Sequence, residues 1–167
     1  MADIPHHALA LGGFTLAHAT WSVSDLPDSE LLCPLAIVVR QGKRELLRFE
    51  AETQAEAISE GKRVMAEEKD AEAWAFAREG AWPMQEGGEA QDVLVVDFWA
   101  EGLLNPLTVI QPFERYTKSG RFCVVGEMII AVNGQILDSA SSGKVIEGIK
   151  AGIQEHSKVA ELWHTWL

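Results

Sequence analysis

Two carboxylates, Asp97 and Glu127, interrupt long apolar stretches and are the best candidates for chemistry in this chain. Asp97 lies within VLVVDFWAEG and Glu127 within RFCVVGEMIIAVNGQIL. If their strands lie on either side of residues 107–115, two strand spacings separate the carboxylates by roughly 10 Å. Carboxylates at that separation can catalyse an inverting hydrolysis or share a cation. Alternatively, each faces solvent or accepts a salt bridge from an arginine such as Arg78 or Arg115.

One histidine and three tryptophans are further candidates. His156 interrupts the apolar stripe of a C-terminal helix, where an imidazole acts as a catalytic group or ligand, or forms a hydrogen bond within the core. Trp99 follows Asp97 in the same stretch, and Trp163 and Trp166 are candidates for a binding anchor because tryptophan is enriched in interface hot spots. The five histidines lack the spacing of metal ligands, so we expect no metal site.

No catalytic or nucleotide-binding motif accompanies these residues. The sequence contains no GxSxG, Walker, HExxH or Rossmann pattern. Gly12-Gly13 and Gly87-Gly88 lack the strand-and-helix context of a phosphate-binding loop. We therefore expect no cofactor, and the motifs leave open whether the chain is an enzyme.

Length and charge limit the choice of partners. A chain of 167 residues fits one domain, 1–167, and its 14 basic and 25 acidic residues give a net charge of −11. Such a charge repels polyanions, so we expect binding neither to nucleic acid nor to an anionic membrane. It suits a soluble protein, or one that binds a basic partner.

The cysteines and the apolar segments indicate the compartment. Cys33 and Cys123 lie in apolar segments without a CxxC motif, which predicts reduced thiols. The N-terminus has no basic region of a secretory signal, and no stretch of about eighteen apolar residues predicts a membrane span. These features favour a cytoplasmic protein.

Hydrophobic periodicity predicts an α+β fold. The pattern predicts about six strands, over 35–40, 45–49, 73–78, 92–101, 107–115 and 122–132. Asn133-Gly134 predicts a hairpin turn, and 85–91 a polar loop. At the N-terminus we expect a short helix that starts at Asp3 and ends at Gly12-Gly13. A loosely alternating segment over 14–23 then favours a strand.

Two longer helices complete the prediction. Thr53 and Glu56 form a capping box for a helix over about 53–69. A serine cluster and an apolar stripe predict another over about 142–166. We expect both on one face of a single, mainly antiparallel sheet, in contact with each other at Gly61 and Gly152.

The strands from Asp92 to Ser139 are apolar on both faces, although helices on one side cover only one of them. Something must therefore cover the second face. We expect a non-enzymatic protein-binding or self-associating module, either a homo-oligomer or the binder of a basic protein. The alternative is a small-ligand-binding or hydrolytic domain with its site on the sheet face around Asp97 and Glu127.

Overall fold

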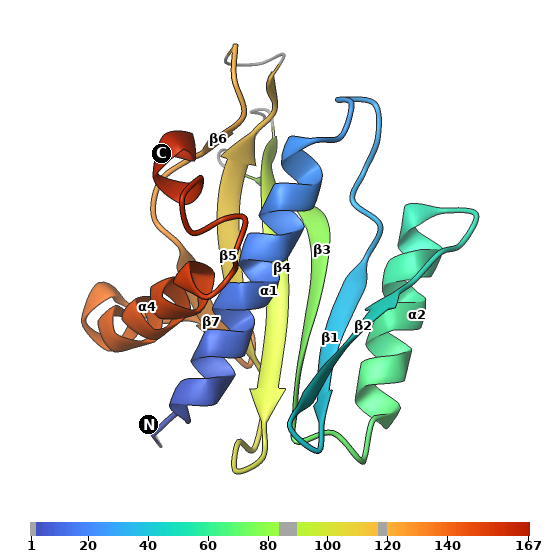
Figure 1. Cartoon of the computed structure of the whole chain (residues 1–167), viewed down its shortest axis with the longest axis vertical. Helices are drawn as coiled ribbons and strands as arrows, with labels where there is room; N and C mark the ends of the chain where they lie inside the picture. Colours follow the sequence, from blue (N-terminus) through green and yellow to red (C-terminus); the bar gives the residue numbers. More distant parts are fainter. Residues whose placement is uncertain (1–2, 84–89, 117–119) are drawn as a thin grey trace.

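An antiparallel sheet with helices on both of its faces makes up this α+β fold (Figure 1). The computed structural model describes residues 3–83, 90–116 and 120–167. Within these residues the strands are β1 (Leu35–Arg40), β2 (Lys43–Arg48), β3 (Ala73–Pro83), β4 (Ala90–Ala100), β5 (Leu107–Glu114), β6 (Cys123–Val124), β7 (Ile129–Val132) and β8 (Gln135–Ile136). The helices are α1 (His6–Ser24), α2 (Gln54–Glu67), α4 (Ser139–Gln154) and the 3₁₀ helix η1 (Trp163–Trp166).

The strand order is β2-β1-β3-β4-β5-β7-β8, and β6 pairs with the end of β5. The α+β class and the antiparallel sheet are therefore confirmed, but the described residues form eight strands and three α-helices instead of about six and two. β4 and β7 flank β5, as the spacing argument requires. The loop predicted over 85–91 lies outside the described residues up to 89, and Ala90 and Gln91 already belong to β4.

Residues with positive φ set the turns of the C-terminal half. Asn133 and Gly134 have φ of 52° and 76° between β7 and β8, which confirms the predicted hairpin. Gly126 has φ of 71° and ends the extended backbone after β6. For this reason the single strand predicted over 122–132 is two strands, β6 and β7.

The prediction for the N-terminus is wrong, because 19 residues form one helix, α1. Gly12 and Gly13 do not end it, and the segment predicted as a strand continues it. α1 is buried on most sides, since it crosses the sheet on one side and contacts α4 on the other (Figure 1). A helix enclosed in this way has no polar face, and its sequence therefore lacks the periodicity that identifies an amphipathic helix.

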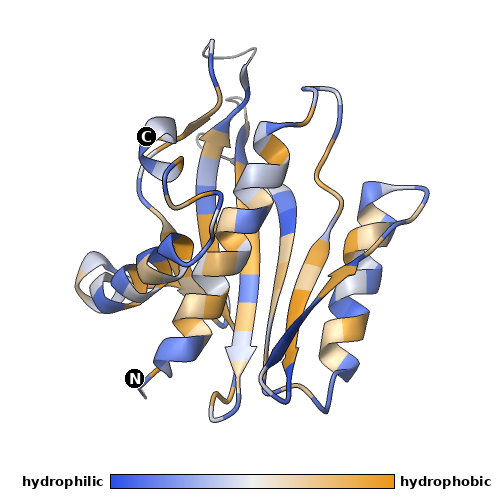
Figure 2. Ribbon diagram, viewed as in Figure 1, coloured by the Kyte–Doolittle hydropathy of each residue, from blue (hydrophilic) through white to orange (hydrophobic). Residues whose placement is uncertain are grey.

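The two faces of the sheet carry separate clusters of apolar side chains. The larger cluster joins α1 and α4 to alternate residues of the strands, among them Ala75, Leu94 and Phe98. The smaller one joins α2 to residues on the opposite face, among them Val38 and Phe76. The central strands are predominantly apolar in Figure 2. The prediction that both helices share one face is therefore wrong.

The glycines of the two helices contact different partners. A Cβ added at Gly61 would lie 2.3 Å from the ring of Phe76, and one at Gly152 would lie 2.1 Å from the carbonyl oxygen of Ala10 in α1. The predicted contact between Gly61 and Gly152 is therefore wrong. Each glycine instead allows its own helix to approach the element that it covers.

α4 ends at Gln154, well before the predicted end at about 166. Nδ1 of His156 accepts hydrogen bonds from the backbone N–H groups of Lys158 and Val159, both at 3.2 Å. In a continued helix these two N–H groups would donate to backbone carbonyl oxygens. The imidazole accepts from them instead, so the helix does not continue. The chain then turns back as η1, where Arg121 donates to the carbonyl oxygens of Thr165 and Leu167 at 2.6 and 2.8 Å.

Candidate functional site

Asp97 connects the three central strands of the sheet. Its Oδ2 accepts from Nη1 of Arg78 on β3 at 2.7 Å, and its Oδ1 accepts from Oγ1 of Thr108 on β5 at 2.6 Å. Both carboxylate oxygens are thus engaged by neighbouring strands. This arrangement is the arginine salt bridge considered for Asp97 from the sequence.

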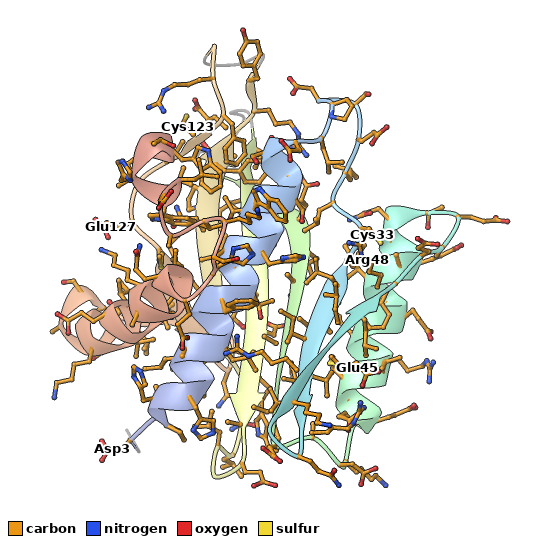
Figure 3. The ribbon with its side chains drawn as sticks, in the orientation of Figure 1. Asp3, Cys33, Glu45, Arg48, Cys123 and Glu127 are labelled. Atoms are coloured by element: carbon orange, nitrogen blue, oxygen red, sulfur yellow. The ribbon has the colours of Figure 1, made fainter. Side chains whose placement is uncertain are left out.

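Glu127 lies apart from this ion pair, beside a different helix. It is exposed between β6 and β7, beside α4 and the C-terminal segment (Figure 3). It lines a cavity of about 280 Å³ against α4 and η1, whereas Asp97 lines a separate cavity of about 170 Å³ against α2. The structure therefore does not bring the two carboxylates into one site, although β4, which carries Asp97, and β7, which follows Glu127, flank β5.

His156, which is buried, pairs with the half-buried His18. Its Nδ1 accepts from two backbone N–H groups, so its proton is on Nε2, which donates to Nδ1 of His18 at 3.2 Å. His18 must then carry its own proton on Nε2, which is buried and has no partner among the described residues. The rings of Phe14 and Trp21 pack against His156. Both nitrogens of His156 are thus engaged within the fold.

Burial holds both imidazoles in the neutral form. It lowers the pKa of His18 below its ordinary value of 6.5, and the positive charge of Arg48 lowers it further. Burial likewise lowers the pKa of His156 below 6.5, with a smaller contribution from His18. A charge on either ring is therefore disfavoured at neutral pH.

This histidine pair should make the protein sensitive to mild acid. Above pH 6.5 both rings are neutral in the folded and the unfolded chain, so their full contribution to stability is present. Below that pH the unfolded chain binds protons that the folded chain resists. Stability is lost as the pH falls through the two lowered pKa values. Urea unfolding at a series of pH values around 6.5 measures the effect.

Replacing one member of the pair identifies its origin. His18→Gln removes one titrating ring and should flatten the loss of stability below pH 6.5. His164→Gln changes an exposed histidine and is the matched control, which should keep the steeper dependence. The same pH dependence in both variants would contradict the assignment to the His18–His156 pair.

The three tryptophans named from the sequence occupy two different regions. Trp99 is half-buried on the sheet face that α2 covers in part, and its Nε1 donates to the carbonyl oxygen of Leu103 at 2.9 Å. Trp163 and Trp166 are each 8% exposed and pack in the larger apolar cluster. Trp163 and Trp166 therefore do not form an exposed anchor, but Trp163 lines the same cavity as Glu127.

Sequence reasoning missed two buried polar residues, Glu79 and Gln111. Arg115 pairs with Glu79 and, at 3.1 Å, with Asp92, instead of with Asp97. Gln111 is 1% exposed and lines the Glu127 cavity. A polar residue within the apolar segment TVIQPF was the available signal for Gln111, whereas no local pattern joins Glu79 to Arg115 across 36 positions.

Comparisons with known proteins add no assignment to this geometry. No protein-family model, no curated protein and no solved structure matches the chain. Across the described ranges, no helix combines the length and apolar character needed to span a membrane. Nor do any three His, Cys, Asp or Glu side chains in those ranges gather closely enough to hold a metal ion.

Proposed function

We propose that the protein is a non-enzymatic binding module that self-associates through one half of the α2 face of its sheet. The observation that carries this proposal is the extent of α2. Its apolar cluster includes residues of β1 and β3 but none of β4, β5, β7 or β8. The half of the face formed by these four strands has no helix over it among the described residues.

We call this uncovered region the open half-face. The alternation of the paired strands assigns to it Val95, Asp97, Trp99, Thr108, Ile110, Ile129, Ala131 and Ile136. Most are half-buried, and Ile136 at the sheet edge is 57% exposed. Apolar and aromatic surface of this kind is typical of the centre of a protein–protein interface.

Charge favours a second copy of the chain over a basic partner. Asp97 lies within the open half-face opposite Thr108, and Arg78 on the neighbouring strand β3 neutralises its charge. Two copies with a net charge of −11 repel each other least where the surface is neutral and apolar. A basic protein would instead favour an acidic surface. A two-fold dimer in which both copies use this half-face satisfies these conditions.

The same proposal assigns the protein to a reducing compartment, the cytoplasm. Cys33 and Cys123 are half-buried and form no disulfide, which agrees with that environment. The negative charge argues against nucleic acid as a partner.

Sedimentation equilibrium tests the self-association. The wild-type chain should sediment as a dimer, and Val95→Glu or Ile129→Glu should give monomers, because an unpaired carboxylate is then buried at the interface. Ile136→Glu should also weaken the dimer. The Ile136 side chain is exposed in the isolated chain, so this variant should keep the fold.

A substitution elsewhere on the surface provides the control. Leu162→Glu introduces the same charge at an exposed apolar residue beside η1, and it should leave the dimer intact. A wild-type chain that is strictly monomeric would contradict self-association, and a basic protein would then be the occupant to examine.

A further inference from the structure

We propose that the cavity beside Glu127 binds an apolar α-amino acid in its zwitterionic form. The proposal is independent of self-association, because the cavity lies against α4 and η1, on the side of the sheet opposite the open half-face. Its volume of about 280 Å³ is near the lower end of the range for small-molecule sites, roughly 300–1,000 Å³. A ligand with few heavy atoms fits such a space, whereas a nucleotide does not.

The walls of the cavity provide an apolar surface from three directions. They include Val124 from β6, Met128 before β7, Ile153 from α4 and Trp163 from η1. All four side chains are at most 8% exposed and belong to the larger apolar cluster. The core therefore fixes their positions, and the site is largely preformed. An aliphatic or thioether side chain matches this surface.

Two acceptors lie on the polar side of the cavity. Nε2 of Gln111 donates to the carbonyl oxygens of Pro112, Gly126 and Val125 at 3.0, 3.3 and 3.5 Å, which fixes the orientation of the amide. Gln111 lines the cavity, and its Oε1 has no hydrogen-bond donor among the described residues. This oxygen and the carboxylate of Glu127 can both accept from an ammonium group.

A cation and an amide donor complete the polar side. Lys150 and Gln154 project from α4 into the lining of the same cavity. Lys150 and Glu127 form no ion pair with each other within 4.0 Å, so neither charge neutralises the other directly. An α-amino acid places a carboxylate and an ammonium group beside an apolar side chain, which matches a lysine, a carboxylate and an apolar wall.

Calorimetry with the full chain tests the ligand class. L-leucine, L-methionine and L-phenylalanine are the probes, and at least one should bind. Isocaproate keeps the side chain and carboxylate of leucine, and isopentylamine keeps its side chain and amine. Each of these fragments should bind at least about tenfold more weakly than leucine, because it loses one charged contact. Absence of binding by all three amino acids, or equal binding of leucine and both fragments, would overturn the proposal.

Substitutions assign each charge to its contact. Lys150→Met should weaken leucine and isocaproate about tenfold or more and leave isopentylamine unchanged. Glu127→Gln should weaken leucine and isopentylamine and leave isocaproate unchanged. Both side chains are exposed, so these variants should fold.

Lys158→Met and Glu161→Gln change the net charge equally at exposed positions outside the cavity lining. They should bind every probe as the wild type does. If they weaken leucine as much as the cavity variants do, the effect is one of overall charge and the proposal fails. The oligomeric state of the cavity variants should be unchanged, which separates this result from the test of self-association.

Discussion

Gly152→Ala should destabilise the protein by about 1–3 kcal/mol, although alanine is the better helix former. A Cβ at this position would lie 2.1 Å from the carbonyl oxygen of Ala10. The clash is with the backbone of α1, so no side-chain rotation relieves it, and α1 and α4 must move apart. Gly13→Ala should have a similar effect, because its Cβ would lie 1.9 Å from the carbonyl oxygen of Ile149.

Gly143→Ala is the matched control on the same helix. A Cβ at Gly143 meets nothing within 4 Å, so only helix propensity changes. This variant should stabilise the protein by up to about 1 kcal/mol. Urea unfolding therefore distinguishes the two positions by the sign of the change in free energy. A Gly152→Ala variant as stable as the Gly143→Ala variant would show that the helices do not cross at this contact.

The combination of the two destabilising changes tests whether they act at one crossing. Gly13→Ala and Gly152→Ala each separate the same two helices, so the second change meets helices that have already moved. The double variant should lose less stability than the sum of the single losses. Additive losses would indicate two independent contacts instead.

Local sequence signals correctly predicted the structural elements that are determined by residues adjacent in the sequence. Thr53 and Glu56 form the expected start of α2, where Oγ1 of Thr53 accepts from the backbone N–H of Glu56 at 3.1 Å. Asn133-Gly134 gives the expected hairpin because only the two turn residues must adopt positive φ. Neither feature depends on what the rest of the chain does.

The errors occurred where distant contacts decide the structure. The glycine pair at 12–13 is typical of a helix end in isolation, yet α1 continues because Phe98 of β4 packs against Gly12 and α4 packs against Gly13. Likewise, the periodicity of α2 indicates which of its sides is apolar, but not which face of the sheet it covers.

In the candidate site, too, the sequence indicated which residues stand out but not how distant segments place them. Asp97 and Glu127 stand out because they interrupt apolar segments, and each does line a cavity. Their placement on opposite faces could not be predicted, since it depends on where β6 ends and on the course of the chain before β7. Gln111 is a comparable case, because its orientation depends on Val125 and Gly126, which are 14 and 15 positions away in the sequence.

Arg115→Met should cost about 3–5 kcal/mol of the free energy of unfolding, the largest loss that we expect from a single substitution. Arg115 donates to Glu79, to Asp92 and to the carbonyl oxygen of Glu30. The side chain of Glu79 is only 6% exposed. Without the guanidinium, this carboxylate remains buried with the backbone N–H of Leu32 as its hydrogen-bond donor.

The cost arises from the charge that remains, which a second substitution can remove. Glu79→Gln keeps an oxygen that can accept from the backbone N–H of Leu32, and it removes the negative charge. The double variant, Arg115→Met with Glu79→Gln, should therefore recover most of the stability that Arg115→Met loses. Guanidinium unfolding of the four proteins in this cycle gives the coupling between the two residues.

An exposed ion pair shows what removal of an arginine costs when water replaces the lost contact. Arg63 pairs with Glu60 and Glu67 on the exposed side of α2. Arg63→Met should leave the unfolding midpoint nearly unchanged, because solvent screens such pairs. If Arg115→Met is as mild as Arg63→Met, Glu79 is not held in a dry environment. Contacts other than the hydrogen bond from the backbone N–H of Leu32 to Glu79 would then have to hold the loop around Leu32 in position.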